Sequence, residues 1–212
     1  MAKNMGLIDY LIEEGSLKTK RIIAAFRKIK RIDFLPEEMG DLSEINEALP
    51  IGSGQTISQP SVVAFMLEEL GPEPGDKILD VGSGSGWTSA LLAEIVGPKG
   101  KVFSLELVPE LKEFGEKNAS RYGFAEKGIS EFIIADGSKG YAKEAPFDKI
   151  LASAATNKIP DSWKEQLKVN GRIVAPINNS IVVCEKKQSA SGEIKFEEKE
   201  YPGFVFVPLL SL

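Results

Sequence analysis

The sequence predicts an α/β protein with a doubly wound, mostly parallel sheet, an N-terminal helical segment and antiparallel strands near the C-terminus. From residue 61 to about residue 175, short apolar runs alternate with helical stretches, as in parallel strands joined by right-handed crossovers. A glycine-rich turn, Gly82 to Gly86, directly follows the first of these runs. The 212 residues, 42% hydrophobic and 27% charged, are ordinary for one globular domain.

The first 60 residues are expected to form helices and a substrate loop. Apolar residues recur at three- and four-residue spacing from Met1 to about Arg31, which predicts helices. The basic side chains opposite that stripe are interpreted as a solvated surface, with an anionic-partner patch as the alternative. Prolines and glycines predict an ordered but irregular loop over 33–60, whose Leu49, Ile51 and Ile57 pack against the rest of the molecule.

Residues 61–177 are expected to form the central layer, in which strands and helices alternate. Proline at position 109 suits the first turn of a helix, where its missing N–H does no harm. The expected strands are 77–81, 101–105, 132–135, 149–152 and 172–175, and the expected helices are 61–70, 87–96, 109–121 and 161–167.

Residues 178–212 change character and complete the same single domain. Strand-like runs at 181–186, 194–199 and 204–207, separated by turns, predict antiparallel strands that close one edge of the sheet. Cys184 lies in the first of these runs and is interpreted as a buried strand residue, with a reactive thiol as the alternative.

Composition excludes several kinds of site. The chain has no histidine, which excludes a Ser-His-Asp triad, an imidazole base and a histidine metal ligand. Its single cysteine excludes an intrachain disulfide and a multi-thiolate metal centre. A net charge of -5 without a basic block argues against nucleic-acid binding, and the apolar runs are too short to span a bilayer. We therefore expect a cytoplasmic protein, a monomer, without a metal, nucleic-acid or membrane partner.

The segment from Ile78 to Gly86 reads Ile-Leu-Asp-Val-Gly-Ser-Gly-Ser-Gly, between a predicted strand and a predicted helix. Glycines let the backbone turn sharply and approach a ligand closely. A dinucleotide fingerprint needs Gly-x-Gly-x-x-Gly, but Trp87 stands where the third glycine belongs. The pattern therefore favours S-adenosylmethionine, a nucleoside ligand without phosphate, over a nicotinamide cofactor.

Acidic residues end three successive predicted strands. Asp80 can receive the ligand's ammonium group directly or through water, and Glu106, about twenty residues past the glycine turn, can hold both ribose hydroxyls. Asp136, with Gly137, can meet the adenine amino group. Because the carboxyl ends of parallel strands meet at one edge, these residues predict a single nucleoside site. Each of these features alone also has a structural explanation. The glycine-rich segment is typical of an ordinary turn, and Glu106 is typical of a helix cap.

Five segments carry a resemblance to a known family: 31–36, 49–60, 145–148, 166–176 and 206–209. The most specific is Gly54-Gln55-Thr56-Ile57-Ser58-Gln59-Pro60. Over about residues 17–209 the chain resembles the protein-L-isoaspartate (D-aspartate) O-methyltransferases. The resemblance implies a class I, Rossmann-like methyltransferase fold. It also implies methyl transfer from S-adenosylmethionine to the α-carboxylate of L-isoaspartyl residues in damaged proteins and peptides.

Carried over by position, the resemblance implies a role for each matching residue. Thr56 and Ser58 match the catalytic positions, and Ile57, Ser58 and Val207 match the substrate-binding ones, with Val207 offering backbone groups to the peptide. Without the resemblance, Ser58 reads as a helix cap before Pro60, and 204–207 as an edge strand. The positions that match the cofactor site are Asp80, Gly82, Ser83, Gly84, Glu106, Leu107, Asp136 and Gly137.

The chemistry is open to a chain without histidine. A carboxylate with a pKa of about 4 is already ionised at neutral pH, so as a nucleophile it needs no general base. The protein's task is then to place one carboxylate oxygen in line with the methyl group, about 3 Å away. Hydroxyl groups and backbone N–H groups are sufficient for that task.

The chain also departs from the family pattern. Glu44 and Asn46 stand where an aromatic residue and an aspartate are common, and Ser61 where an aromatic residue or histidine is usual. We expect these three positions to cluster on the substrate side. Two alternatives therefore stay open: a divergent methyltransferase acting on another carboxylate or a dedicated peptide, and a non-catalytic S-adenosylmethionine-binding protein.

Overall fold

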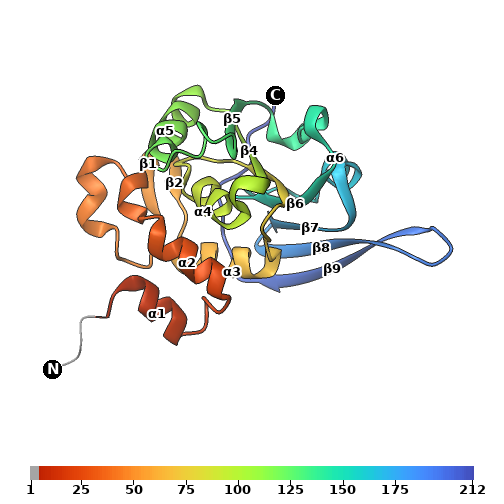
Figure 1. Ribbon diagram of the computed structural model, residues 1–212, viewed down its shortest axis with the longest axis horizontal. Coiled ribbons are helices and arrows are strands. Elements are labelled where there is room, and N and C mark those ends of the chain that lie inside the picture. The colour runs from red at the N-terminus through yellow and green to blue at the C-terminus, as the bar shows by residue number, and fades with distance from the viewer. Residues whose placement is uncertain (1–4) are drawn as a thin grey trace.

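A computed structural model describes residues 5–212, and a seven-stranded sheet of order β5-β4-β3-β6-β7-β8-β9 forms its centre (Figure 1). The five strands from β5 to β7 are parallel, and β8 and β9 continue the sheet antiparallel. This confirms the predicted fold class. The strands are β3 (Lys77–Val81), β4 (Lys101–Glu106), β5 (Ser130–Ile134), β6 (Phe147–Ala152), β7 (Leu167–Ile177), β8 (Ser180–Gln188) and β9 (Ile194–Pro202).

Two hydrophobic clusters, one on each face of the sheet, form the core. Alternate residues of a strand point to opposite faces, so in β3 Ile78 belongs to one cluster and Leu79 to the other. The first cluster takes in helices α1 to α5, and the second takes in α6 through Trp163. The helices are α1 (Leu7–Glu13), α2 (Lys20–Lys28), α3 (Pro60–Leu70), α4 (Trp87–Val96), α5 (Pro109–Ser120) and α6 (Asp161–Gln166).

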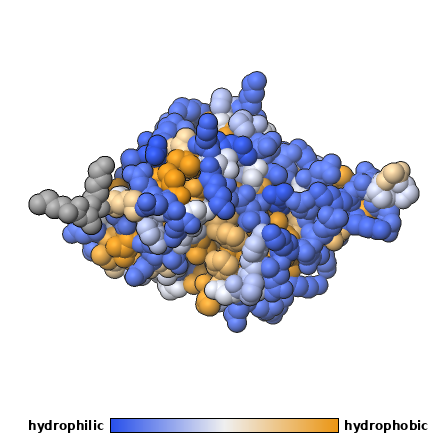
Figure 2. All heavy atoms as spheres, turned by 90° about the horizontal axis from the view of Figure 1, so that it is seen from below, coloured by the Kyte–Doolittle hydropathy of each residue, from blue (hydrophilic) through white to orange (hydrophobic). Residues whose placement is uncertain are grey.

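The helices cover the sheet because their apolar stripes turn inward. In α2, for example, Ile22, Ala25 and Phe26 are buried while Arg27 and Lys28 are exposed. On the face seen in Figure 2, hydrophilic residues predominate and hydrophobic ones appear in small separate patches. The helical prediction for residues 1–31 is confirmed from Leu7 onward as two helices, and residues 1–4 lie outside the described part.

The segment over 33–60 contains more regular structure than predicted. Two 3-10 helices, η1 (Arg31–Phe34) and η2 (Glu37–Leu42), are followed by an antiparallel hairpin of β1 (Leu49–Gly52) and β2 (Gln55–Ile57). The prediction of an irregular loop was wrong there, because the positive φ angles in the tight turn between β1 and β2 allow two short strands to pair. The expected packing of Leu49, Ile51 and Ile57 is confirmed, since all three are buried.

The predicted strand at 204–207 is wrong. Gly203 has a φ of +98°, and the N–H groups of Gly203 and Phe204 both donate to the carbonyl oxygen of Asn179. The chain therefore leaves the sheet after β9. It then crosses the carboxyl edge, where the Ala155 N–H donates to the Val207 carbonyl and the Leu209 N–H donates to the Ala155 carbonyl. This path brings the C-terminal segment, residues 204–212, over the ends of β3 and β6.

Cys184 is fully buried in β8, as predicted. Burial raises the pKa of its thiol to about 11, which leaves almost no reactive thiolate at neutral pH. Within residues 5–212, no cluster of three or more cysteine, aspartate or glutamate side chains is suited to a metal ion. Over the same residues, none of the helices combines the length and apolar character needed to cross a membrane.

The close packing of the glycine loop (Gly82–Gly86) on α5 yields a stability prediction. Gly86 has a φ of +82°, and a Cβ atom there would lie 2.5 Å from the Gly115 carbonyl oxygen. Gly71 also has a positive φ, of +60°, but its Cβ would meet only a side-chain nitrogen at 3.6 Å. In urea unfolding, Gly71→Ala should cost roughly 1–2 kcal/mol from backbone strain. Gly86→Ala should cost about 1–3 kcal/mol more, from the added clash. Equal losses would contradict the packing described.

Candidate active site

The site lies at the carboxyl edge of the sheet, where the strand order reverses. After β3 the chain builds β4 and β5 on one side and then returns to place β6 on the other. The crevice between β3 and β6 is therefore a topological switch point, the usual ligand site of such sheets. A first cavity opens here, and the Ser153 N–H, just after β6, donates to the Val81 carbonyl at its base.

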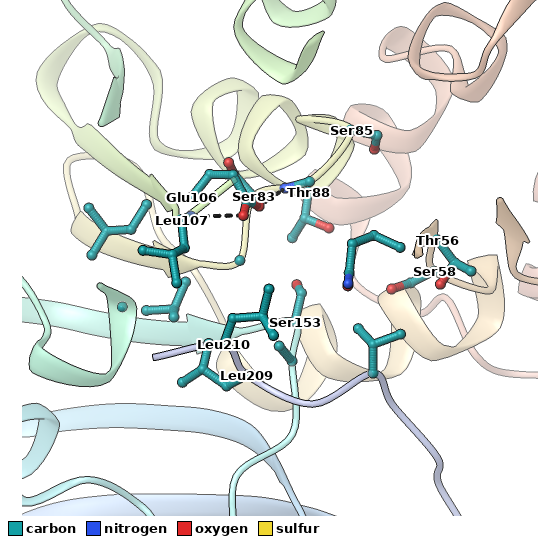
Figure 3. A pocket seen from close by; sticks show the side chains of 18 of the residues that line it. Thr56, Ser58, Ser83, Ser85, Thr88, Glu106, Leu107, Ser153, Leu209 and Leu210 are labelled. Atoms are coloured by element: carbon teal, nitrogen blue, oxygen red, sulfur yellow. Dashed lines mark hydrogen bonds between the residues drawn. The ribbon is translucent and has the colours of Figure 1, made fainter. Parts of the chain in front are cut away.

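Figure 3 shows the groups that surround this cavity. Glu106, Leu107 and Ser83 lie on one side, and Thr56 and Ser58 lie on the opposite side. The remaining labelled groups are Ser85, Thr88, Ser153, Leu209 and Leu210. Six separate parts of the chain thus meet here: β2 with the residue after it, the glycine loop with α4, the end of β4, the segment after β5, the segment after β6 and the C-terminal segment.

Backbone hydrogen bonds fix the path of the glycine loop. The N–H groups of Gly82 and Ser83 both donate to the Leu105 carbonyl, at 2.9 and 3.0 Å. Gly82 and Gly84 have positive φ angles, a conformation that glycine adopts without strain. The Ser83 hydroxyl is buried without a hydrogen-bond partner in the described structure. The loop therefore lines the cavity largely with backbone, and Ser83 adds a buried hydroxyl without a partner in the described structure.

Glu106 is the acidic residue of the cavity. One carboxylate oxygen accepts the Gly84 N–H at 2.9 Å, and the other accepts the Leu107 N–H at 2.8 Å (Figure 3). The second oxygen also accepts the Val108 N–H, at 3.1 Å. The residue is only 8% exposed. A carboxylate offers about four acceptor sites, so one remains for a hydroxyl donor in the cavity. Glu106 and Leu107 both line the first cavity beside the glycine loop, and their role in cofactor binding stays a prediction.

Asp80 lies behind the cavity and does not line it. Its side chain is fully buried, one oxygen accepts the Ser89 hydroxyl at 2.5 Å, and the other has no partner. Desolvation raises the pKa of this carboxyl to about 7, with a smaller contribution from Glu106, while the bond from Ser89 lowers it. A direct contact between Asp80 and a ligand's ammonium group is therefore not available in this geometry, and the contact through water stays a prediction.

Asp136 also points away from the cavity, whereas its neighbours Ala135 and Gly137 line it. Its carboxylate accepts the N–H and hydroxyl of Ser138, pairs with Lys139 at 3.0 Å and accepts the Leu212 N–H. Burial works to raise the pKa of Asp136, but these bonds outweigh it and hold the pKa at about 2. The carboxylate therefore anchors the C-terminal segment. The residues on either side of Asp136, and not its side chain, line the cavity.

Thr56 and Ser58 stand where two cavities meet. A second cavity of 350 Å³ runs from Ala48 and Val62 to the C-terminal segment at 203–207. It shares Thr56, Ser58, Ser153 and Val207 with the first cavity. Ile57 also lines the first cavity, and its side chain packs into the core at 3% exposure. Hydroxyl groups thus occupy the junction, and Val207 borders it from the C-terminal segment.

The three departures from the family pattern line neither cavity. Glu44 accepts the N–H of Leu7, the first residue of α1, at 3.1 Å. Asn46 accepts the N–H of Ser61 in the first turn of α3, at 2.9 Å. These side chains satisfy helix N-termini, so the expectation that they shape the substrate side is wrong. Asn46 also supplies the cap expected of Ser58, because α3 begins at Pro60 after Gln59 with no side-chain bond from Gln59.

Several residues of the first cavity were not predicted. Ser153 directly follows β6, so the rule that found Asp80 and Glu106 at strand ends would have found it too. Gln55 and Thr88 line the cavity from β2 and α4. Leu209 and Leu210 reach it because the chain leaves the sheet at Gly203, where the sequence pattern predicted a turn followed by another strand.

Comparison with known proteins bears on the whole chain. The family model described as protein-L-isoaspartate(D-aspartate) O-methyltransferase matches residues 2–212. A protein-L-isoaspartate O-methyltransferase of Methanopyrus kandleri is 39% identical over 208 residues, covering 96% of this chain and 89% of the relative. Protein-L-isoaspartate O-methyltransferase 2 of Archaeoglobus fulgidus is 42% identical over 210 residues, covering 98% and 92%.

Solved structures resemble the chain over almost its whole length. A protein-L-isoaspartate O-methyltransferase superposes with a TM-score of 0.82 at 27% identity, over 95% of this chain and 64% of that one. A Plasmodium falciparum protein described as a beta-aspartate methyltransferase, in complex with S-adenosyl-L-homocysteine, gives a TM-score of 0.79 at 23% identity, over 96% of each chain. At 23% identity, this second similarity is evidence for a shared fold only.

The buried carboxyl of Asp80 predicts a pH dependence of stability. Its pKa rises from 3.8 to about 7 on folding. Between about pH 4 and pH 7 the folded protein therefore keeps a proton that the unfolded chain has released. The free energy of unfolding falls as pH rises through this window, by about 1.4 kcal/mol for each unit of pKa difference.

Asp80→Asn removes this contribution, so its stability should fall less between pH 4 and pH 7 than that of the wild type, as measured by urea unfolding at each pH. The exposed Asp41→Asn is the control and should keep the wild-type slope. Parallel curves for Asp80→Asn and the wild type would contradict the burial of an ionisable Asp80.

Proposed function

The chain belongs to the protein-L-isoaspartate (D-aspartate) O-methyltransferase family, and we propose how its site carries out that family's reaction. The enzyme transfers the methyl group of S-adenosylmethionine to the α-carboxylate of L-isoaspartyl residues in damaged proteins and peptides, which is a repair reaction. The observation that carries the proposal is the junction at Thr56 and Ser58, where a cavity walled by the glycine loop and Glu106 meets a second cavity open to a peptide.

The residues of the first cavity fit the cofactor. The buried carboxylate at Glu106 has one acceptor site left for a hydroxyl such as that of a ribose, and the glycine loop leaves room for a ligand against bare backbone. At Gly137 a Cβ atom would lie 2.5 Å from a methyl of Val81, so this position has no room for a side chain. When bound, S-adenosylmethionine supplies an electrophilic methyl group on a positively charged sulfur.

The proposed binding residues act by different means. Glu106 contacts the ligand through its side chain, while Gly82, Ser83, Gly84, Leu107 and Gly137 do so through backbone or short side chains. For Asp80 and Asp136 we propose indirect roles, because Asp80 supports the start of α4 through Ser89, and Asp136 holds the C-terminal segment. Neither needs to touch the ligand.

On the acceptor side we propose that Ser58 and Thr56 orient the substrate carboxylate. Their hydroxyls lie between the two cavities, where they can donate to one carboxylate oxygen and leave the other directed at the methyl group. Val207 borders the same junction, and its carbonyl already accepts from Ala155, so the C-terminal segment is held in place beside the peptide. Ile57 supports this wall from the core.

We also propose that the side chains of Leu209 and Leu210 turn aside when cofactor binds, while the backbone of the C-terminal segment stays bound to Ala155 and Asp136. The free volume of the first cavity is 60 Å³, whereas small-molecule sites usually enclose roughly 300–1,000 Å³. Leu209 and Leu210 lie across the cavity from Glu106 and Leu107 (Figure 3). Their outward movement provides the missing space without disturbing the sheet.

The wider assignments rest on the sequence and on the arrangement of the core. We propose that the chain acts as one methyltransferase domain, because both hydrophobic clusters pack on the same sheet. A cytoplasmic monomer fits the buried, unpaired Cys184 and the acidic composition.

The activity is tested with purified protein, labelled S-adenosylmethionine and a matched pair of peptides that differ only in an L-isoaspartyl or aspartyl linkage. The isoaspartyl peptide should be methylated and the aspartyl peptide should not. Methylation of proteins in a cell extract but not of the isoaspartyl peptide would instead favour a divergent methyltransferase. Cofactor binding without any turnover would favour a non-catalytic protein.

Ser58→Ala should lower turnover of the isoaspartyl peptide. A hydrogen bond to a charged group contributes about 1.5–3 kcal/mol, which corresponds to roughly a 10- to 100-fold loss in kcat/KM. Affinity for S-adenosylhomocysteine, measured by calorimetry, should stay nearly unchanged. Ser61→Ala, whose side chain lines neither cavity, is the matched control. An equal loss of cofactor affinity in Ser58→Ala would place Ser58 on the wrong side of the junction.

Glu106→Gln should weaken cofactor binding. The amide loses the charged acceptor and places an NH2 group against backbone N–H donors that the carboxylate accepts, so the Kd for S-adenosylhomocysteine should rise roughly 10- to 100-fold in calorimetry. Glu110→Gln changes an exposed glutamate in the first turn of α5 and should bind as the wild type does. An unchanged Kd for Glu106→Gln would remove the ribose contact from the proposal.

A further inference from the structure

Arg31 is a buried cation that the proposed chemistry does not use. It begins η1, is only 5% exposed, and directs its guanidinium at backbone carbonyls. One terminal nitrogen donates to the carbonyls of Ser43 and Ile45 at 3.3 and 3.0 Å, and the other donates to those of Glu47 and Ser58 at 2.6 and 3.4 Å. Four carbonyls from one stretch of chain, 43–58, thus converge on a single side chain.

The same guanidinium also meets the cofactor side. Its central carbon lies 5.6 Å from the centre of the Trp87 ring, within the range of a cation–π contact. Trp87 is the first residue of α4, directly after the glycine loop, and is 2% exposed. Phe26 packs edge-on against the indole at 5.6 Å between ring centres. The indole therefore has a fixed position, and Arg31 lies against it.

Arg31 in this way touches both halves of the site. The carbonyls that it binds belong to the segment that carries Ser58, and the indole belongs to the loop and helix that form the cofactor cavity. Desolvation lowers the pKa of Arg31 to about 10, partly offset by Glu44, so the side chain remains a cation at neutral pH. A lysine retains the charge but lacks the planar fork that reaches several carbonyls at once.

We propose that Arg31 is a positioning residue for methyl transfer. By binding the 43–58 carbonyls and stacking on Trp87, it sets the distance between the segment that carries Ser58 and the glycine loop. The inference rests on the proposed function, because it assigns the acceptor to one side of this contact and the donor to the other. Since a misplacement of about 1 Å can cost 100-fold in rate, the alignment of the reacting atoms should depend on Arg31.

The test compares Arg31→Lys with Arg27→Lys, a matched change of an exposed arginine on α2. Activity is measured on the isoaspartyl peptide at a temperature at which circular dichroism shows each variant folded. For Arg31→Lys, kcat should fall about 100-fold while the KM for the peptide and the Kd for S-adenosylhomocysteine change little. Arg27→Lys should match the wild type. A role in folding alone would lower the melting temperature and leave kcat of the folded enzyme intact.

A second variant tests the Trp87 contact, and it replaces Arg31→Lys as the test of the inference if Arg31→Lys does not fold. Trp87→Leu should lower kcat at least about tenfold. Where both single variants fold, the double variant should lose no more than Arg31→Lys alone, because the two residues act through one contact. A folded variant with kcat within threefold of the wild type would overturn the inference. A loss of S-adenosylhomocysteine affinity equal to the loss in kcat would overturn it too. Absence of activity in the wild type would count against the proposed function instead.

Discussion

The carboxylate of Glu106 ties the glycine loop to the end of β4, and the rest of the candidate site depends on that contact. Three backbone N–H groups, from Gly84, Leu107 and Val108, converge on its two oxygens. The loop is also held from Leu105 and packs against α5. A turn rich in glycine has many accessible conformations, so these bonds select one of them and leave its backbone facing the cavity. The acidic group that orders the loop is the one proposed to hold the ribose.

The acceptor side is built differently, from segments that lie outside the central layer of the fold. The β1–β2 hairpin precedes the seven-stranded sheet in the chain and brings Thr56 and Ser58 to the cavity. The C-terminal segment follows the last strand of that sheet and brings Val207. Both halves meet over the switch point between β3 and β6. This division suits a reaction in which the acceptor is already an anion, because the protein needs only to align two partners and exclude water. A chain without histidine can perform that task.

Periodicity predicted the central layer closely, and tertiary contacts explain where prediction stopped. The bounds of β3 and α4 matched because a buried run and a helical run flank unmistakable glycines. The burial of Asp80 was not predictable, since a strand-end carboxylate looks the same in sequence whether it faces a cavity or Ser89. Residues 204–207 alternate like a strand, yet Asn179 and Ala155 draw the chain off the sheet. Glu44 and Asn46 appeared to belong to the substrate side and instead cap helices.

The most direct test is a crystal structure of the full chain with S-adenosylhomocysteine. One ribose hydroxyl should lie within hydrogen-bonding distance of Glu106. The sulfur should point toward Ser58, and Leu209 and Leu210 should be displaced to admit the nucleoside. Space for a carboxylate should remain between the sulfur and the Ser58 hydroxyl. A nucleoside bound away from the crevice between β3 and β6, or a sulfur with no room beside it for the acceptor, would contradict the proposed site.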